Sequence, residues 1–113
     1  MNYEIELSSI AEAEADNAFL QISKFTSSDN AKRWYTGLLK AIESLSTMPN
    51  RCPLARENEY FSQEIRQLLY GRGRNSYRVI FTVLESTPAV RILHIRHASQ
   101  QVTGTQPESG EED

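Results

Sequence analysis

The chain has 113 residues, of which 39% are hydrophobic and 24% charged, and its formal net charge is −3. This length supports one hydrophobic core, and the composition is that of a folded globular protein rather than a disordered or fibrous one. No apolar run is long enough to cross a bilayer, and the amino terminus lacks an export pattern, so we expect a cytoplasmic protein. The single cysteine, Cys52, agrees with a reducing compartment and is interpreted as a small buried side chain.

The first segment predicts a strand followed by a helix. Residues 2–7 alternate polar and apolar side chains, which is the period of a half-buried strand. Apolar residues then recur three and four positions apart from Ala11 to Phe25, so a helix follows with one face toward a core. Ser8 or Ser9 can cap this helix because a serine hydroxyl accepts a hydrogen bond from a free backbone N–H.

A second helix is predicted after a short interruption. Polar residues at 26–30 break the helical period, and we expect a turn there. The apolar stripe resumes from Ala31 to Met48, where Pro49 ends it, and Trp34 and Tyr35 are interpreted as core aromatics of this helix. The two helices form a hairpin whose apolar faces need a common surface, and a sheet is the only candidate.

The carboxyl-terminal half predicts three further strands. Residues 50–61 show neither the helical nor the strand period and are interpreted as a loop. Three β-rich runs follow, separated by short connections rich in turn-forming residues, at residues 64–70, 76–84 and 90–97. Gly71 and Gly73 lie between two of these runs, so their spacing indicates a hairpin turn rather than a phosphate-binding loop before a helix.

The expected fold is therefore α+β, with the order β-α-α-β-β-β. The helical hairpin packs on one face of a small, mainly antiparallel four-stranded sheet. We assign residues 1–101 to one domain, and we expect residues 102–113, which are polar and contain four acidic residues, to be a disordered acidic tail.

Arginine is concentrated in the predicted sheet. Six arginines and only two acidic residues lie between residues 64 and 98, and a folded domain places such charge in a sheet mainly to meet an anion. On the strand period Arg78 points away from Tyr77 and Val79, so it lies on an open face if those two residues meet the helices. Arg78→Ala is then predicted to abolish function while leaving the fold intact. The candidate anion-binding residues are Arg66, Arg72, Arg74, Arg78 and Arg96.

Histidine supplies the candidate proton-transfer group. His97, near the end of the last strand, titrates close to neutral pH, and Glu57 is a weaker candidate for a carboxylate partner. His94 and His97 are three residues apart on a predicted strand and so face opposite sides, which argues against a chelating pair. We predict neither a metal site nor a cofactor.

Several segments, taken in this order, resemble the RelE/ParE superfamily, the toxins of bacterial type II toxin–antitoxin systems. They span residues 2–100 and are the first strand, the helical pair ending at Met48-Pro49, and residues 53–57, 65–71, 77–81 and 92–98. The resemblance implies a small cytoplasmic bacterial protein that inhibits growth, serves in plasmid stabilisation, and is held inactive by a cognate antitoxin in a hetero-oligomer. We expect the antitoxin to cover part of the sheet over the arginines.

Two activities are implied by this resemblance. The RelE-like branch cleaves messenger RNA on the ribosome, and in that case Arg78, His97 and Arg66 would be catalytic. The ParE-like branch binds DNA gyrase and poisons it without known catalysis. Residues 98–102 contain no aromatic side chain for base stacking, and the acidic tail repels RNA, so we favour the gyrase binder. A ribonuclease and a degenerate, non-toxic interaction partner are the alternatives.

Overall fold

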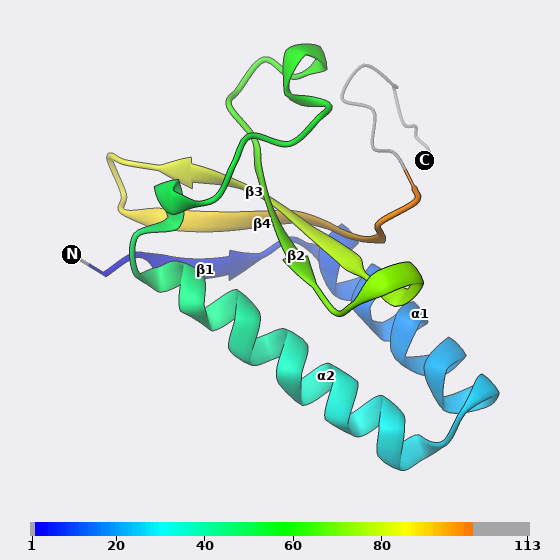
Figure 1. Cartoon of the computed structure of the whole chain (residues 1–113). Helices are drawn as coiled ribbons and strands as arrows, with labels where there is room; N and C mark the ends of the chain where they lie inside the picture. The colour runs from blue at the N-terminus through cyan, green and yellow to red at the C-terminus, as the bar shows by residue number, and fades with distance from the viewer. Residues whose placement is uncertain (1, 101–113) are drawn as a thin grey trace.

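The computed structural model describes residues 2–100 and has the predicted order of elements. The sheet has four strands, and Figure 1 shows the helices α1 and α2 beside it. The elements are β1 (Glu4–Leu7), α1 (Ser9–Phe25), α2 (Ser28–Glu43), β2 (Arg66–Tyr70), β3 (Tyr77–Leu84) and β4 (Ala89–His97). The predicted acidic tail, residues 102–113, lies outside the described residues. None of the helices in the described part combines the length and hydrophobicity that crossing a bilayer requires.

The sheet is mixed, with the strand order β1-β4-β3-β2. β2, β3 and β4 form an antiparallel meander, whereas β1 pairs in parallel with β4. The chain between these two parallel strands contains both helices, β2 and β3. β1 is short and pairs only with the Ala89–Ile92 part of β4. The second half of β4 therefore extends beyond its neighbour, with α1 alongside it (Figure 1).

The helices cover one face of the sheet, as predicted. Ser8 caps α1 by accepting a hydrogen bond from the Ala11 N–H at 3.0 Å, and Ser27 caps α2 in the same way. Buried side chains from both helices meet buried side chains of β3 and β4, namely Ala11, Ala15, Leu38, Ile42, Val79, Phe81, Val90, Ile92 and Ile95. Trp34 and Tyr35 are partly buried and pack against this core, which agrees with their interpretation as core aromatics.

Two ends of the predicted apolar stripes lie in solvent. Phe25, the last residue of α1, is 80% exposed, and Figure 1 shows that this end of α1 projects beyond the sheet. α2 ends at Glu43, earlier than predicted, and Met48 is exposed with the left-handed φ of 51° before Pro49. Pro49 therefore follows a short irregular segment rather than ending the helix.

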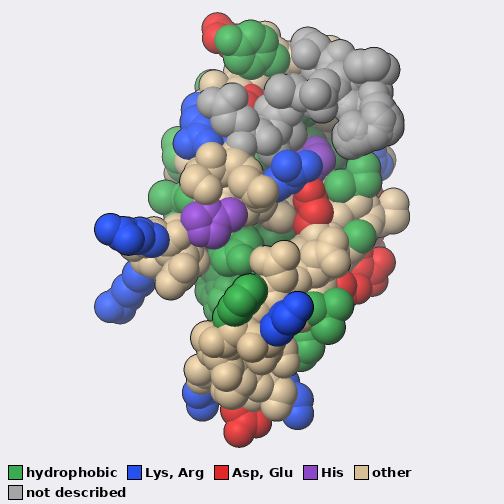
Figure 2. Space-filling model, turned by 90° about the vertical axis from the view of Figure 1, so that its right-hand side faces the viewer, with side chains coloured by type: hydrophobic (Ala, Val, Ile, Leu, Met, Phe, Trp, Pro, Cys, Tyr) green, Lys and Arg blue, Asp and Glu red, His purple; other side chains and the backbone are tan. Residues whose placement is uncertain are grey.

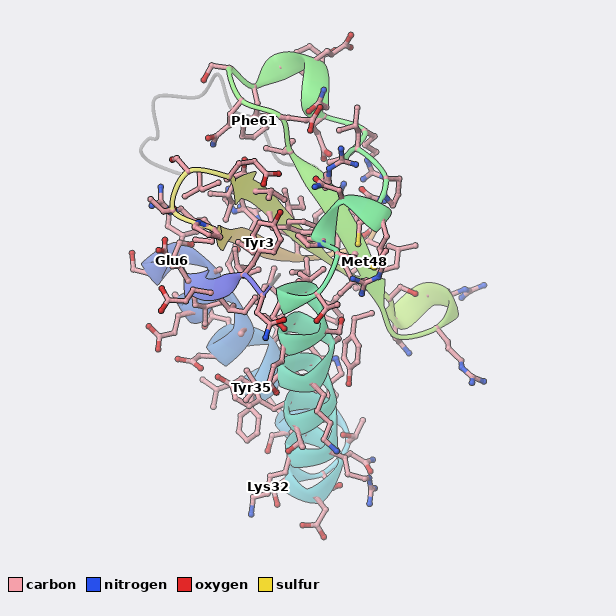
Figure 3. The ribbon with its side chains drawn as sticks, turned by 90° about the vertical axis from the view of Figure 1, so that its left-hand side faces the viewer. Tyr3, Glu6, Lys32, Tyr35, Met48 and Phe61 are labelled. Carbon is pink, nitrogen blue, oxygen red and sulfur yellow. The ribbon has the colours of Figure 1, made fainter. Side chains whose placement is uncertain are left out.

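The face of the sheet away from the helices is covered by the loop between α2 and β2. Ala55 and Ile65 from this loop bury Ile80 of β3, and Phe61 packs against the same small cluster. Figure 3 shows Phe61 on this loop and Tyr35 on α2, with the sheet between them. The expectation of an open second face is thus wrong, because the segment that shows no periodicity folds back over the sheet.

The connection between β2 and β3 is a hairpin turn, as its composition indicated. Gly71 and Gly73 have φ values of 100° and 59°, a region that side-chain-bearing residues rarely occupy. Arg72 and Arg74 alternate with these glycines and are exposed. The turn therefore carries two cations away from the body of the sheet.

Candidate functional site

Arg78 lies on the predicted face of β3 but is buried, with only 1% of the residue exposed. Both terminal nitrogens of its guanidinium bind the Glu57 carboxylate, with 2.9 Å from Nη1 to Oε1 and a second bond from Nη2 to Oε2. Nη1 also donates to the Gln67 side chain and Nη2 to the Gln100 carbonyl, each at 2.9 Å. The covering loop supplies Glu57, so the predicted open-face arginine is an internal ion pair.

Arg66 lies on the opposite face from Arg78. The register pairs Arg66 with Phe81, which faces the helices, whereas Arg78 faces the loop. Arg66 Nη1 donates to the Cys52 carbonyl at 2.6 Å, and Arg66 Nη2 lies 3.1 Å from a Glu64 carboxylate oxygen. Cys52 is buried, as predicted, and burial raises the pKa of its thiol.

All four arginines within the strands are paired with carboxylates. Besides Arg66 and Arg78, Arg91 lies 3.2 Å from Glu6, and Arg96 lies 2.6 Å from Glu14. Among residues 2–100, Arg72 and Arg74 are the candidate arginines with no such partner. Figure 2 accordingly shows basic side chains scattered over the face in view rather than gathered into one patch.

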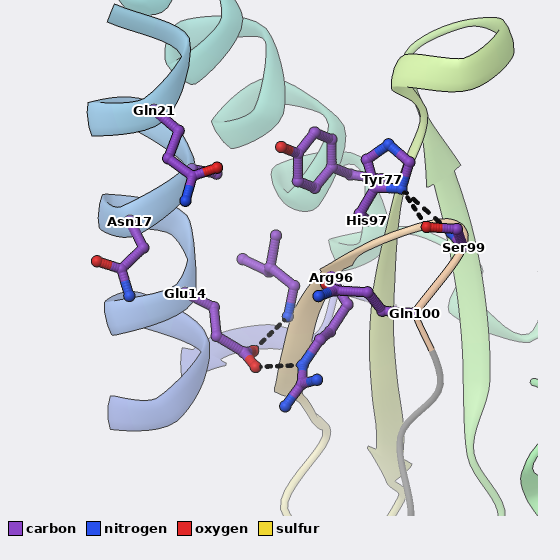
Figure 4. A pocket seen from close by; sticks show the side chains of 10 residues that line it. Glu14, Asn17, Gln21, Tyr77, Arg96, His97, Ser99 and Gln100 are labelled. Atoms are coloured by element: carbon purple, nitrogen blue, oxygen red, sulfur yellow. Dashed lines mark hydrogen bonds and ion pairs between the residues drawn. The ribbon is translucent and has the colours of Figure 1, made fainter. Parts of the chain in front are cut away.

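A polar pocket of about 540 Å³ lies between α1 and the carboxyl end of β4 (Figure 4). Its helical wall is one face of α1, because the lining positions 14, 17, 18 and 21 are spaced three and four residues apart. Its other wall comes from β3, β4 and the residues after β4. The lining residues are Glu14, Asn17, Ala18, Gln21, Tyr77, Ile95, Arg96, His97, Ser99 and Gln100.

His97, the predicted acid or base, lines this pocket. The Ser99 N–H donates to its Nδ1 at 3.2 Å, so the proton of the neutral ring is on Nε2. The ring packs edge-to-face on Tyr77, with 5.4 Å between centroids. His97 pairs with Tyr77 on the helix side of the sheet, and Arg78 is on the loop side. The structure therefore does not bring these two proposed catalytic groups together.

Glu14 organises the base of the pocket, although its role was missed at the level of sequence. One carboxylate oxygen accepts the Ile95 N–H at 2.8 Å, and the other lies 2.6 Å from Arg96 Nε and 3.3 Å from His94 Nδ1. Burial raises the pKa of Glu14, but the hydrogen bonds from His94, Ile95 and Arg96 outweigh burial and hold that pKa below its ordinary value. The available signal was its position, three residues after Ala11 on the buried face of α1.

His94 and His97 face opposite sides of the sheet, as predicted, since their register partners are Ile80 and Tyr77. Within the part of the chain that is described, no group of three or more His, Cys, Asp or Glu side chains is placed to hold a metal ion.

Comparison with known families identifies the class of protein. A family model described as the ParE toxin of the type II toxin–antitoxin system parDE matches residues 5–102. The chain belongs to the ParE toxin family. The predicted resemblance to the RelE/ParE superfamily, on its ParE-like side, is thereby confirmed. No curated protein matches this ParE-family chain.

Solved structures of toxin–antitoxin proteins share the fold of this ParE-family chain. The chromosomal ParDE system from P. aeruginosa has a chain that is 16% identical, with a TM-score of 0.69 over 84% of this chain and 95% of that one. The RelBE2 complex from Mycobacterium tuberculosis gives 19% identity and a TM-score of 0.54, over 88% of this chain and 95% of that one. A mutant of E. coli RelE in the free state is 13% identical, with a TM-score of 0.50 over 88% of this chain and 86% of that one.

Glu14→Gln is expected to make the free energy of unfolding of this ParE-family protein fall less steeply as the pH is lowered. A depressed folded-state pKa means that Glu14 stabilises the fold above the ordinary glutamate value of about 4.3 and loses this effect as pH falls through the lower folded value. Urea unfolding at several pH values between 7 and 3 measures the slope of the free energy of unfolding against pH. Glu12→Gln, on the exposed side of the same helix, is the control and should keep the wild-type slope. Equal slopes for all three proteins would contradict the assignment.

Proposed function

We propose that this protein is the toxin of a type II toxin–antitoxin pair, that it acts in the cytoplasm by binding DNA gyrase without catalysing a reaction of its own, and that a cognate antitoxin neutralises it. Membership of the ParE toxin family supports the toxin role. The observation that favours a binder over a ribonuclease is the pairing of every strand arginine with a carboxylate.

A ribonuclease that attacks through a ribose hydroxyl must stabilise a dianionic phosphorane with available cations and must move protons with an acid–base group. Arg78 is buried against Glu57, and a substrate phosphate would have to break that pair to reach it. Breaking a buried pair is costly, because the carboxylate left behind is neither solvated nor neutralised. His97 lies on the other side of the sheet. This arrangement supports recognition rather than phosphate chemistry.

The hairpin turn between β2 and β3 is the best candidate for contact with the target. Arg72 and Arg74 project from it without ion-pair partners among the described residues, and Leu69 at the end of β2 is 59% exposed. Arginine is enriched both at protein interfaces and among the residues that contribute most of their binding energy, and the exposed Leu69 adds apolar surface near the turn. We therefore assign these three residues to the gyrase contact.

Replacing both Arg72 and Arg74 with alanine is expected to weaken inhibition of gyrase supercoiling about tenfold or more, because two exposed charges that steer and hold an acidic partner are lost. The measurement is the concentration of purified protein that halves supercoiling activity. Lys32→Ala/Arg33→Ala is the matched control, since it removes two cations from the far end of α2, where Figure 3 labels Lys32. Equal loss in both double variants would show a general charge effect instead of a local contact.

A ribosome-dependent ribonuclease remains the second candidate, because His97 and Arg96 do line an open pocket. Expression in a bacterial host separates the candidates. Growth arrest with intact messages and an induced DNA-damage response supports the gyrase binder. Message cleavage on ribosomes that is abolished by His97→Ala supports the ribonuclease, and absence of arrest supports a non-toxic interaction partner.

A further inference from the structure

β1 lies at one edge of the sheet, and its outer side is open at Ile5 and Leu7. The Glu4 and Ser8 N–H groups donate to carbonyls on the β4 side, at 2.9 and 3.0 Å. Because main-chain groups alternate in direction along a strand, the N–H and C=O of Ile5 and of Leu7 point away from β4. No backbone hydrogen bond within residues 2–100 uses these outward groups. The edge therefore offers donors and acceptors to a further strand.

A hollow of about 480 Å³ lies beside this open edge, between β1 and the last turns of α2. Most of its lining side chains are apolar, and the lining residues are Tyr3, Ile5, Leu7, Leu39, Ile42, Glu43 and Ser46. Figure 3 looks onto this side of the molecule and labels Tyr3 and Glu6 on β1. At Tyr3 the edge is closed, because the Tyr3 N–H donates to the Ser46 carbonyl at 2.8 Å. A strand added beyond Tyr3 would place alternate side chains over the hollow.

The surroundings of the hollow are acidic. Glu43 lines it from the end of α2, and Glu4 lies on the opposite face of β1. Both side chains are exposed, and neither forms an ion pair within the described residues. Glu85 is at the same edge, where its carboxylate accepts the Tyr3 hydroxyl at 2.8 Å. An apolar hollow bordered by carboxylates favours a partner that carries both apolar and basic side chains.

The same charges disfavour a second copy of this chain as the partner. If two β1 strands paired antiparallel about Ile5, Glu4 of each copy would lie opposite Glu6 of the other. If they paired about Glu6, the two Glu6 side chains would face each other. Like charges directly opposite each other destabilise a strand pair, and acidic residues on an edge strand oppose self-association in this way. The occupant must therefore bring cations of its own.

We propose that the outer edge of β1 binds an extended protein segment in which basic and apolar residues alternate. The segment pairs with the main chain at Ile5 and Leu7, its apolar side chains fill the hollow over Leu39, and its basic side chains lie beside Glu4. Backbone bonds to a sheet edge supply affinity in this mode of recognition, and the alternate side chains supply specificity. The inference goes beyond the proposed function, because the turn assigned to gyrase follows β2, the strand at the opposite edge of the sheet.

Synthetic peptides test this inference on the purified protein, without reference to toxicity or to an antitoxin. The probe is a peptide of about eight residues that alternates lysine and valine. It is expected to bind at least tenfold more tightly than a peptide that alternates glutamate and valine, and than one with the same lysines and valines in two blocks. On binding, amide hydrogen exchange at Ile5 and Leu7 is expected to slow. Equal binding of the three peptides, no binding, or protection only at other residues would overturn the inference.

A matched pair of variants tests the backbone donor at Leu7. Leu7→Ala and Leu7→Pro both remove the isobutyl group, but only proline removes the outward N–H, which β4 does not use. The dissociation constant of the lysine–valine peptide is expected to be about tenfold higher for Leu7→Pro than for Leu7→Ala. Equal constants, with equal melting temperatures of the two free variants, would overturn the inference.

Charge reversal tests the acidic side of the contact and leaves the backbone edge intact. Glu4→Lys is expected to lower about tenfold the ratio between the affinities for the lysine–valine and the glutamate–valine peptides. Glu59→Lys, at an exposed position in the loop between α2 and β2, is the matched control and should keep the wild-type ratio. The same change of ratio in both variants would overturn the inference. Protection of Ile5 and Leu7 that grows with protein concentration in the absence of peptide would identify a second copy as the occupant and would also overturn it.

Discussion

Arg78→Ala is expected to lower the free energy of unfolding by about 3–5 kcal/mol, the usual cost of removing one partner from a buried ion pair. The arginine and Glu57 are 1% and 3% exposed, so water cannot solvate the carboxylate that the substitution leaves behind. The bonds to Gln67 and to the Gln100 carbonyl are lost at the same time. Urea unfolding at pH 7 measures the change.

Two comparisons make the Arg78 prediction specific. Arg91→Ala removes an arginine whose side chain is 50% exposed beside Glu6, and it should cost less than about 1 kcal/mol. Replacing the pair together, as Arg78→Met with Glu57→Leu, should restore much of the lost stability, because no buried charge then lacks its partner. A wild-type melting temperature for Arg78→Ala would mean that the side chain is open to solvent, as the strand pattern alone had suggested.

Phe81→Ala is expected to lower the free energy of unfolding by about 3–5 kcal/mol through lost burial and the cavity that remains. Phe81 is fully buried at the centre of β3, where the helices meet the sheet. Leu38→Ala, on the facing side of α2, should cost about 2–5 kcal/mol for the same reason. Thermal or urea unfolding gives both values.

Phe25→Ala is the natural control for Phe81→Ala, because it removes the same side chain from a position that is 80% exposed. Its effect on the free energy of unfolding should stay within about 0.5 kcal/mol. Similar losses at the two phenylalanines would show that α1 buries its last turn and that the core does not lie where the structure places it.

The order of elements was predictable because each element carries its own periodicity. The alternation in residues 2–7, the two helical stripes and the three β-rich runs all correspond to observed elements. The faces of individual strand residues were also predictable, since the strand period places Arg78 opposite Tyr77 and separates His94 from His97. These predictions needed no knowledge of what lies above either face.

The candidate site was less predictable because its partners are distant in the chain. Arg78 and Glu57 are separated by 21 residues, and Arg96 and Glu14 by 82. A local count of acids and bases could not include Glu6, Glu14 or Glu57, so the strands seemed to hold unpaired positive charge. The register of β2 on β3, which places Arg66 on the helix side, also depends on pairing between strands rather than on either strand alone.

The sequence by itself determined the class of fold, the order of its helices and strands, and a resemblance that the family match confirms. The tertiary structure decided which charges remain available to a partner. Local periodicity follows from backbone geometry and is written in neighbouring residues, whereas burial and ion pairing depend on segments that meet only after folding. The loop carrying Glu57 shows no period of its own, yet its position over the sheet turns a candidate anion site at Arg78 into part of the protein's interior.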